Sequence, residues 1–372
     1  MIFTGKWSVK IVEVIADSSL TGGPRHVFDL VSGFKDAGYR FDVICPAGWL
    51  ADQLEEGGLA KVNRVKIKSA FDRDAIAGVK SLLQEIKPDV VHAHGTRAGI
   101  LAARAMAKDS IPLVYTEHRW TADFHLKNPI RQWLQLRALR GVGRRAAKMI
   151  GVSQAVSQFL TEQKISPPEK TVTVHNGIAL PVQIKDAVHT DTPVIGSVGS
   201  LIPVKNFSLL LTAFAQVLKS FPQAKLEIVG EGEEARTLKQ LVIKLGIEGR
   251  VSLLGRVDDL AAKYLSWDIF VSTSTTESFG LAIAEAMAAG LPVVATDFAA
   301  ARELITEDVG YRVDFKDADI AKAVVRLLWE EDLRARMGEA GRHRIEANFS
   351  QYKMVRDLEK VYREAAAASV SI

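Results

Sequence analysis

Short runs of apolar, often β-branched residues alternate along the chain with longer segments in which apolar residues recur every three or four positions. In the first half, the short runs predict strands at 9–16, 41–46, 62–67, 89–94, 112–118, 148–153 and 171–177. Between them, segments such as 26–39 and 73–87 have the periodicity of amphipathic helices. Strand followed by helix in repetition predicts a parallel sheet with helices on both faces.

The same alternation starts again near residue 193. It predicts further strands at 193–199, 225–230, 251–255, 268–274, 292–297 and 310–314. The 372 residues therefore predict an α/β fold of two Rossmann-like domains in series. The polar, proline-flanked stretch 179–193 is the expected linker. We expect domains over 1–180 and 181–351, with a last helix, 352–372, that packs back on the first.

The composition of the chain argues against a disulfide-linked, a secreted or a membrane-spanning protein. A single cysteine, Cys45, excludes an internal disulfide and fits a reducing compartment. The N-terminus has no long apolar core of a signal peptide. No run of eighteen apolar residues occurs, because the best candidate is interrupted by Glu285 and Pro292. We therefore expect a cytoplasmic protein that does not span a membrane.

Charge is spread unevenly between the two halves. Residues 1–190 hold 26 Lys and Arg against 18 Asp and Glu, whereas the remainder holds 22 against 26. A basic first half favours an anionic partner. The segment 127–150 has seven Lys and Arg and no acid, and Trp133, Leu134 and Leu136 interleave with them. It is either a solvated basic helix face or an interfacial helix that binds an anionic membrane surface. No nucleic-acid-binding module is present.

The stretch ESFGLAIAE (277–285) places two carboxylates around a helix start. A buried strand precedes it, and the helix that follows ends at Gly290. The amides of Phe279, Gly280 and Leu281 would form an anion site at the helix N-terminus. Glu277 lies before this site, and Glu285 lies little more than one turn into an apolar helix. The simpler alternative is a core helix with one glutamate facing water. Two carboxylates on either side of a phosphate site suit a ligand that has hydroxyl groups at both ends and a phosphate between them. A nucleotide sugar has that shape.

These residues resemble the signature of the retaining GT-B glycosyltransferases of family 4. That signature, E-x-F-G-L-x-x-x-E-A-M-A-x-G-x-P-V-V-A, matches ESFGLAIAEAMAAGLPVVATD. The resemblance implies two Rossmann-like domains that face each other across a cleft. It implies transfer of a sugar, with retention, from a nucleotide sugar to a glycan or lipid-linked acceptor, as in polysaccharide and cell-envelope synthesis. It also implies that Glu277 contacts the sugar hydroxyls and Glu285 the ribose, which would then supply the partners of a buried Glu285.

The resemblance extends over almost the whole chain. TGGPRHVFDL (21–30) is similar to the glycine-rich first loop of the family, DVVHAHG (89–95) and VYTEH (114–118) to strands that end in histidine, and VGSLIPVKN (198–206) to the first loop of the donor domain. The implied donor-side residues are Gly22, Gly23, Lys205, Gly230 and Arg256, with Lys205 on the diphosphate. His94 is the implied active-site histidine, and Arg25 and His118 lie on the acceptor side.

The chain departs from the family at Ser200, where an arginine is usual. Serine cannot provide a bidentate cationic contact to a diphosphate, so one phosphate clamp is missing or replaced. The sequence leaves the base and sugar of the donor open, with a UDP-sugar favoured over a GDP-sugar. Two rival functions remain: a nucleotide-sugar epimerase on the same architecture, and a non-catalytic nucleotide-sugar-binding subunit, which only Ser200 favours.

Neither a bound dinucleotide nor a metal ion is expected. IVGEGEEA (228–235) matches a dinucleotide fingerprint, but its three glutamates would repel a pyrophosphate. His92 and His94 share one face of a strand, yet no third ligand follows at metal spacing. A core or capping role remains an alternative for each of them. No Asp-x-Asp motif lies in a loop after a strand. The departing diphosphate would therefore be stabilised by Lys205 and the helix amides. If the segment 127–150 binds a membrane, we expect the protein to be peripheral on the inner face of the cell membrane.

Overall fold

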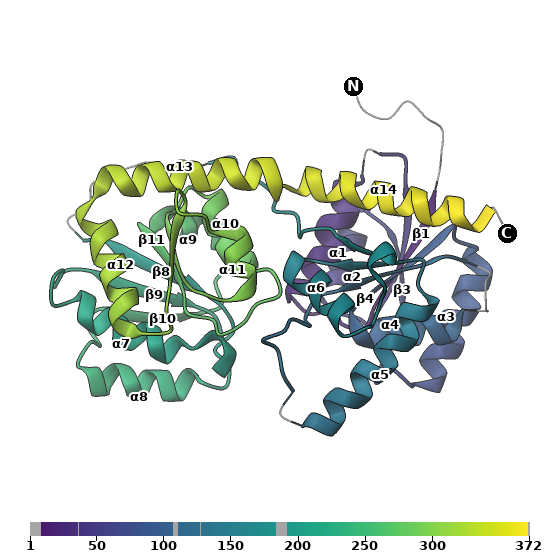
Figure 1. Ribbon diagram of the computed structural model, residues 1–372, viewed down its shortest axis with the longest axis horizontal. Coiled ribbons are helices and arrows are strands. Elements are labelled where there is room, and N and C mark those ends of the chain that lie inside the picture. Colours follow the sequence, from purple (N-terminus) through teal and green to yellow (C-terminus); the bar gives the residue numbers. More distant parts are fainter. Residues whose placement is uncertain (1–8, 36, 107–110, 127, 184–191, 371–372) are drawn as a thin grey trace. The chain divides into compact units, whose positions relative to one another are not determined.

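The computed structural model describes residues 9–35, 37–106, 111–126, 128–183 and 192–370 (Figure 1). It divides into two compact units, the first formed by Met1–Gly177 with Gln351–Ile372 and the second by Ile178–Ser350. The boundaries lie three residues and one residue before those expected from the sequence. Of the expected linker, residues 179–183 are irregular, whereas 184–191 lie outside the described residues.

The first unit has a parallel sheet whose described strands follow the order β3-β2-β1-β4-β5-β6-β7. The strands are β1 (Lys10–Ile15), β2 (Arg40–Cys45), β3 (Lys61–Arg64), β4 (Val90–His94), β5 (Leu113–Glu117), β6 (Lys148–Gly151) and β7 (Thr171–Thr173). Each strand expected in this half is confirmed. The strand order reverses between β1 and β4, and ligands of such sheets bind at the carboxyl ends of the strands near that point.

Helices cover this sheet and complete its core. They are α1 (Gly22–Gly33), α2 (Trp49–Glu56), α3 (Arg73–Ile86), α4 (Gly95–Ala105), α5 (Pro129–Arg145), α6 (Gln154–Glu162), the short 3-10 helix η1 (Pro168–Lys170) and α14 (Gln351–Val370). The terminal helix α14 packs against α1, β4 and β5. Its residues Val355, Leu358 and Tyr362 are buried in the core that β1, β2 and α1 share. The first unit is thus completed by a segment from the far end of the chain.

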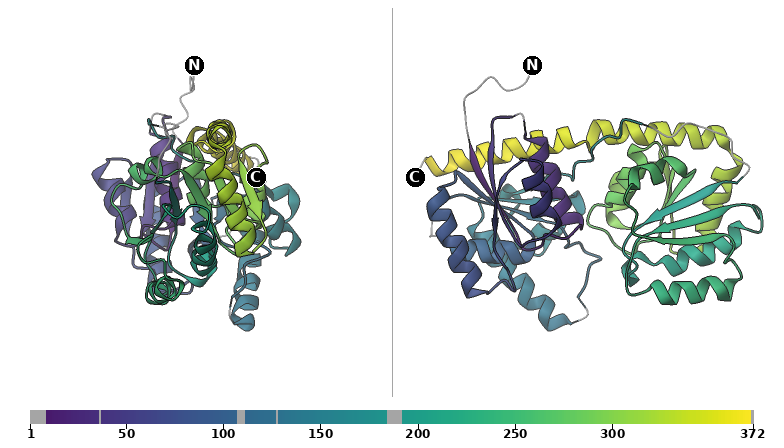
Figure 2. Two further views of the ribbon diagram at one scale, coloured as in Figure 1. Left: turned by 90° about the vertical axis from the view of Figure 1, so that its left-hand side faces the viewer. Right: turned by 180° about the vertical axis from the view of Figure 1, so that it is seen from behind.

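The second unit has a parallel sheet with the described strand order β10-β9-β8-β11-β12-β13. The strands are β8 (Val194–Val198), β9 (Lys225–Val229), β10 (Val251–Gly255), β11 (Ile269–Ser272), β12 (Val293–Thr296) and β13 (Gly310–Val313). Every strand expected in this half is confirmed as well. Figure 2 shows this sheet, like the first, between helices on its two sides. The order reverses between β8 and β11, so these strands mark the second candidate binding edge.

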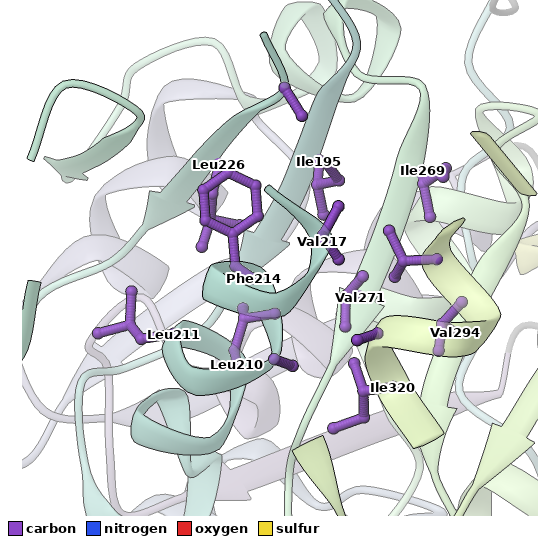
Figure 3. Close-up of a cluster of buried hydrophobic side chains, with 14 of the residues drawn as sticks. Ile195, Leu210, Leu211, Phe214, Val217, Leu226, Ile269, Val271, Val294 and Ile320 are labelled. Atoms are coloured by element: carbon purple, nitrogen blue, oxygen red, sulfur yellow. The ribbon is translucent and has the colours of Figure 1, made fainter. Parts of the chain in front are cut away.

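The helices of the second unit pack on its sheet through a continuous apolar core. They are η2 (Pro203–Lys205), α7 (Phe207–Val217), α8 (Ala235–Leu245), α9 (Leu260–Ser266), α10 (Leu281–Ala288), α11 (Ala299–Leu304), α12 (Asp317–Trp329) and α13 (Glu331–Asn348). Figure 3 shows Phe214 and Val217 of α7 against Leu226 and Ile195 of the sheet, with Ile320 of α12 nearby. None of the helices in the described part of the chain has both the length and the apolar character needed to cross a bilayer.

Candidate active site

In the second unit, the loop between β11 and α10 carries the motif that the sequence singled out. Gly280 forms the N-terminal cap of α10 with a φ of 95°, a left-handed conformation that favours glycine. The ring of Phe279 is buried and packs against Phe349, so this residue can offer a ligand only its backbone amide. The helix begins at Leu281, as expected, and its first amides point out of the N-terminus. The backbone thus has the form of an anion site.

Lys205 and Glu277 lie together beside this helix start. The Lys205 ammonium forms an ion pair with Glu277 Oε1, and the hydroxyl of Ser274 donates to the same oxygen at 2.9 Å. Thr273 Oγ1 donates to the carbonyls of Lys205 and Asn206 at 3.0 Å each. The loop after β11 is therefore tied to the η2 turn. Both side chains of the ion pair keep about a fifth of their surface exposed, 20% and 21%, so a ligand can reach them.

Glu285 is half-buried on α10, and the protein itself provides a partner for it. The hydroxyl of Tyr264, on α9, donates to Glu285 Oε2 at 3.0 Å. The expectation that a ribose alone supplies the partners of a buried Glu285 is therefore corrected in two respects: the side chain is only partly buried, and Tyr264 holds one of its oxygens. Tyr264 fits the family resemblance in its place along the sequence, but its contact with Glu285 was not predicted, because a tyrosine twenty-one positions earlier forms no motif with Glu285.

Gly230 lies where two backbone segments approach closely. Its φ is 145°, and a Cβ at this position would lie 1.9 Å from the carbonyl oxygen of Gly199. The neighbouring amide of Leu201 donates to the carbonyl of Glu231 at 2.8 Å. This close approach explains the glycine of the apparent dinucleotide fingerprint without any nucleotide. Ser200 and Arg256 are both exposed, and in the described part of the chain neither forms a hydrogen bond or an ion pair with Lys205 or Glu277.

In the first unit, the corresponding sheet edge is organised around Glu13, which is fully buried on β1. Its Oε2 lies 2.6 Å from His94 Nε2, and its Oε1 accepts a hydrogen bond from the Tyr362 hydroxyl at 2.9 Å. His92 Nδ1 lies 3.2 Å from Glu13 Oε2. Burial alone would raise the pKa of Glu13, but His92 and His94 hold it well below its usual range. Glu13 was missed from the sequence, although a glutamate inside KIVEVI is the same signal that drew attention to Glu285.

His92 has a structural explanation in this network. Its Nδ1 lies 2.7 Å from the Tyr362 hydroxyl, and its Nε2 lies 2.7 Å from Thr116 Oγ1. Both ring nitrogens are therefore satisfied by groups of β5 and α14. His92 is a core histidine, one of the roles that the sequence left open, and it links the terminal helix to the sheet.

His94 and His118 lie in direct contact, and His26 of α1 joins them. His94 Nδ1 is 3.1 Å from His118 Nε2, and the His26 ring centroid is 5.5 Å and 4.9 Å from those of His94 and His118. His26 and His94 are buried, whereas His118 is half-buried. Burial lowers the pKa of His26 to about 3 and that of His94 to about 4, and it also holds the pKa of His118 well below its usual value. All three imidazoles are therefore neutral at pH 7.

The carboxylate of Glu117 fixes the backbone that carries His118. Its Oε1 accepts from the amides of His118 and Arg119 at 3.0 and 2.9 Å, and its Oε2 accepts from the Tyr115 hydroxyl. A buried carboxylate that gathers two amides holds a turn in one conformation. This explains structurally why a glutamate directly precedes His118.

The glycine-rich loop of the first unit leads into α1. The Asp17 carboxylate accepts from the Ser19 amide and from the Thr21 hydroxyl, at 3.0 and 3.1 Å. Thr21 is the N-cap residue, but its side chain does not cap the helix. Gly22 and Gly23 begin α1, so their amides form an uncapped helix start. Arg25 is half-exposed and forms an ion pair with Asp29 at 3.2 Å.

The basic segment forms α5, and its first turns carry exposed apolar side chains. Ile130, Trp133 and Leu134 are 70%, 56% and 52% exposed. Leu136, which the sequence grouped with them, is instead buried against the body of the unit. The Arg137 guanidinium lies over the Trp133 ring, 5.7 Å from its centroid. Lys127, the first basic residue of the segment, lies outside the described residues.

Two family models match the chain in succession. Residues 20–180 match the model described as Glycosyltransferase Family 4, and residues 183–344 match the one described as Glycosyl transferases group 1. The junction between the two matches falls close to the division between the two units.

Curated relatives and solved structures agree with these matches. N-acetyl-alpha-D-glucosaminyl L-malate synthase of Bacillus anthracis is 28% identical over 78% of this chain and 79% of its own length. Phosphatidyl-myo-inositol mannosyltransferase of Mycolicibacterium smegmatis is 29% identical over 84% and 83%. The structure of HepE from Anabaena in complex with UDP and glucose is similar with a TM-score of 0.82, at 23% identity, over 95% of this chain and 99% of that chain. At that identity the structural likeness shows a shared fold.

Proposed function

This chain belongs to the glycosyltransferases of family 4 and has their GT-B fold, and from that premise we propose that it transfers a sugar from a nucleotide-sugar donor to a glycan or lipid-linked acceptor. The proposal includes retention at the anomeric carbon and independence from a metal ion. The observation that carries it is the pairing of Lys205 with Glu277 at the N-terminus of α10. The Lys205 cation and the amides at the helix start suit a diphosphate, and the Glu277 carboxylate suits the hydroxyl groups of a sugar.

The second unit is proposed to bind the donor. The α10 amides and Lys205 receive the diphosphate, so the negative charge that develops on the leaving group meets a cation and a helix dipole. Glu277 then exchanges its contact with Lys205 for hydroxyls of the sugar. Glu285, oriented by Tyr264, accepts from the ribose hydroxyls. A UDP-sugar is favoured, because UDP is bound in the similar HepE structure, and a GDP-sugar is the alternative.

His94 is proposed to act on the transferred sugar. The Glu13 carboxylate fixes the ring through Nε2 and raises the electron density on Nδ1. Such a histidine can position the sugar or stabilise the positive charge that develops as the bond to the diphosphate breaks. Arg25 and His118 are proposed to serve the acceptor.

Screening of nucleotide sugars by thermal shift tests the donor assignment. We expect one UDP-sugar or GDP-sugar to raise the melting temperature and then to be consumed only when an acceptor is present. Conversion of the sugar without an acceptor would instead indicate the epimerase, and binding without any turnover would indicate a non-catalytic subunit.

Metal independence has its own test. Because Lys205 and the α10 amides already provide positive charge for the diphosphate, transfer should continue at an unchanged rate in EDTA. Loss of activity in the chelator, restored by manganese or magnesium, would contradict the metal-free mechanism.

We further propose that α5 binds the inner face of the cell membrane, where a lipid-linked acceptor would lie. The exposed Ile130, Trp133 and Leu134 can enter the interface while the arginines beside them meet anionic headgroups. Each arginine near an anionic surface contributes roughly 1 kcal/mol, and salt screens the attraction within about 10 Å. The attachment should therefore be reversible and dependent on salt.

Sedimentation with vesicles tests this part of the proposal. Arg131, Arg137 and Arg144 are exposed on α5, whereas Arg140 donates to the carbonyl of Gln163 at 3.1 Å and is left unchanged. Replacing the three exposed arginines by glutamine should release the protein from phosphatidylglycerol-containing vesicles. Vesicles of phosphatidylcholine alone should bind neither form.

A matched control is offered by α8 of the second unit. Its exposed basic residues are Arg236, Lys239 and Lys244. Replacing these three by glutamine changes the net charge equally but should leave vesicle binding intact. If both triple variants sediment like the unaltered protein, the basic face of α5 is only a solvated one.

A further inference from the structure

Three histidines from separate elements of the first unit converge at one point. They are His26 of α1, His94 at the end of β4 and His118 just after β5, and one ring nitrogen from each lies within 4.8 Å of the others. From this cluster, which we call the histidine triad, we infer a binding site for a divalent transition-metal ion of the Zn²⁺ class. The inference concerns the first unit alone and does not depend on the proposed function.

The spacing of the triad suits such an ion. His94 Nδ1 and His118 Nε2 are 3.1 Å apart. Two imidazole nitrogens bound at about 2.0–2.1 Å to a tetrahedral zinc ion lie about 3.3 Å from each other. Little movement of these two rings is therefore needed to receive the ion, and His26, with ring centroids at 4.9 and 5.5 Å from theirs, provides the third nitrogen.

His26 supplies an independent indication that a ligand belongs here. Its side chain is 3% exposed, and among the described residues neither of its ring nitrogens has a hydrogen-bond partner. The side chain of Asn176 lies close enough to His26 to favour its protonated form, but no hydrogen bond of good geometry joins the Asn176 amide oxygen to either ring nitrogen. A buried polar group without a partner costs roughly 1–3 kcal/mol, so a protein rarely keeps one without a reason. Coordination of a metal ion by His26 would remove that cost.

The surroundings of His94 prepare it as a ligand. Glu13 Oε2 lies 2.6 Å from Nε2, so the proton of the neutral ring is held there and the lone pair of Nδ1 faces the triad. A carboxylate behind a ligating histidine is the usual arrangement at metal sites, because it fixes the ring and increases its basicity. His118 is half-buried, so an ion can reach the triad from solvent. A water molecule would then be the fourth ligand of the ion.

A second group of possible ligands, Glu13, His92 and His94, is less suited to a metal ion. All three are fully buried, and both nitrogens of His92 are already engaged by Tyr362 and Thr116 at 2.7 Å. Metal binding there would break hydrogen bonds that the fold has satisfied, whereas binding at the triad would satisfy nitrogens that lack partners. The observations therefore favour the triad.

Metal binding at the triad would remove His94 from any other task. If His94 acts on the sugar, as proposed above, the ion is an inhibitor and not a cofactor. Zinc should then slow transfer, and a chelator should restore it. This consequence rests on the proposed function, whereas the existence of the site does not.

Titration of the chelator-stripped full chain with Co²⁺ tests the site directly. Three imidazoles and a water should give the intense visible absorption of four-coordinate Co²⁺ with a stoichiometry of one, and one equivalent of Zn²⁺ should abolish it. His26→Leu should lose this spectrum, with affinity reduced more than about 100-fold, beyond the effect of altering an outer-shell group. Because the substitution removes two unsatisfied nitrogens, its melting temperature without metal should not fall.

His343→Gln is the matched control, since His343 is 70% exposed on α13 and far from the triad in sequence. It should bind Co²⁺ like the unaltered chain. Absence of the spectrum in the unaltered chain, or an identical spectrum in His26→Leu, would overturn the site and leave the triad as a hydrogen-bonded cluster. UDP affinity measured on the same stripped protein reports separately on the donor site, so the failure of one proposal is distinguishable from the failure of the other.

Discussion

The Lys205–Glu277 pair of the second unit is charged and reaches solvent, whereas His92 and His94 of the first unit are buried around the carboxylate of Glu13. Lys205 and Glu277 each keep about a fifth of their side chain exposed, 20% and 21%. Glu13 and His94 have no exposed side-chain surface, and burial lowers the pKa of His94 and of its neighbour His26 so that both are neutral at pH 7. The ion pair of the second unit is open to a ligand from solvent. The site of the first unit is held by the same contacts that hold the fold.

Because of this difference, substitutions at the two sites should have different effects on folding and on ligand binding. An ion pair that solvent reaches contributes little to folding, so its residues are free to serve a ligand. A buried carboxylate is different, because its removal leaves every group that it satisfied without a partner. Substitutions of Lys205 or Glu277 should therefore change ligand binding with little effect on stability. Substitutions of Glu13 should destabilise the fold as well.

The largest effect should come from Glu13→Ala. The substitution leaves the Tyr362 hydroxyl and the His94 ring without their buried acceptor, and it removes the carboxylate that lies 3.2 Å from His92. Removing one partner of a buried charged network costs about 3–5 kcal/mol. We expect the free energy of unfolding in urea to fall by that amount.

Glu277→Ala provides the control, since its ion pair is partly exposed and should contribute less than about 1 kcal/mol. Equal losses in the two variants would mean that burial does not separate the sites as described. A loss in Glu13→Ala below about 1 kcal/mol would mean that the network around Glu13 is not a structural centre.

The same difference between the two sites explains which features of the structure could be predicted from the sequence. The strands were predictable throughout, because period and composition are local properties of each segment. The placement of Glu277, Gly280 and Glu285 around the start of one helix was predictable too, since a single loop and helix carry all three. Their positions follow from a short stretch of chain that folds in one known way.

The hydrogen-bond network around Glu13 in the first unit could not be predicted from a short stretch of sequence. Glu13, His94 and Tyr362 meet although Tyr362 is 349 positions from Glu13. Only the packing of α14 against β4 brings the tyrosine there, and no pattern in either segment encodes that pairing. The third histidine near His94 was missed for the same reason: spacing along the chain was searched, whereas His26 arrives from another element.

A smaller effect, on binding alone, is expected from Glu285→Gln. The charged acceptor that we propose for the ribose is lost, which should weaken UDP affinity by about 1–3 kcal/mol in calorimetry. The melting temperature should change little, because the side chain is only half-buried and an amide oxygen can still accept from Tyr264.

Tyr264→Phe sharpens this result. It removes the hydroxyl that orients Glu285 but leaves the carboxylate, so the loss should be smaller, about 0.5–1.5 kcal/mol. If calorimetry finds unchanged affinity in both variants, Glu285 belongs to the surface of the helix and has no part in the donor site.

The smallest effect, and the only gain, is expected from Ser200→Arg. Ser200 is exposed beside Gly199, next to the turn that carries Lys205, and the loop has no second cation close to the ion pair of Lys205 and Glu277 in the described structure. An arginine can form a bidentate contact with a diphosphate, but at an exposed position it should add only about 1 kcal/mol. UDP affinity should therefore rise several-fold and become more sensitive to salt. Ser200→Gln, similar in length but uncharged, should show neither change. An arginine variant that binds UDP no better than the glutamine variant would mean that the diphosphate does not lie against this loop. The partly exposed ion pair of Lys205 and Glu277 would then have to serve a ligand other than a nucleotide diphosphate.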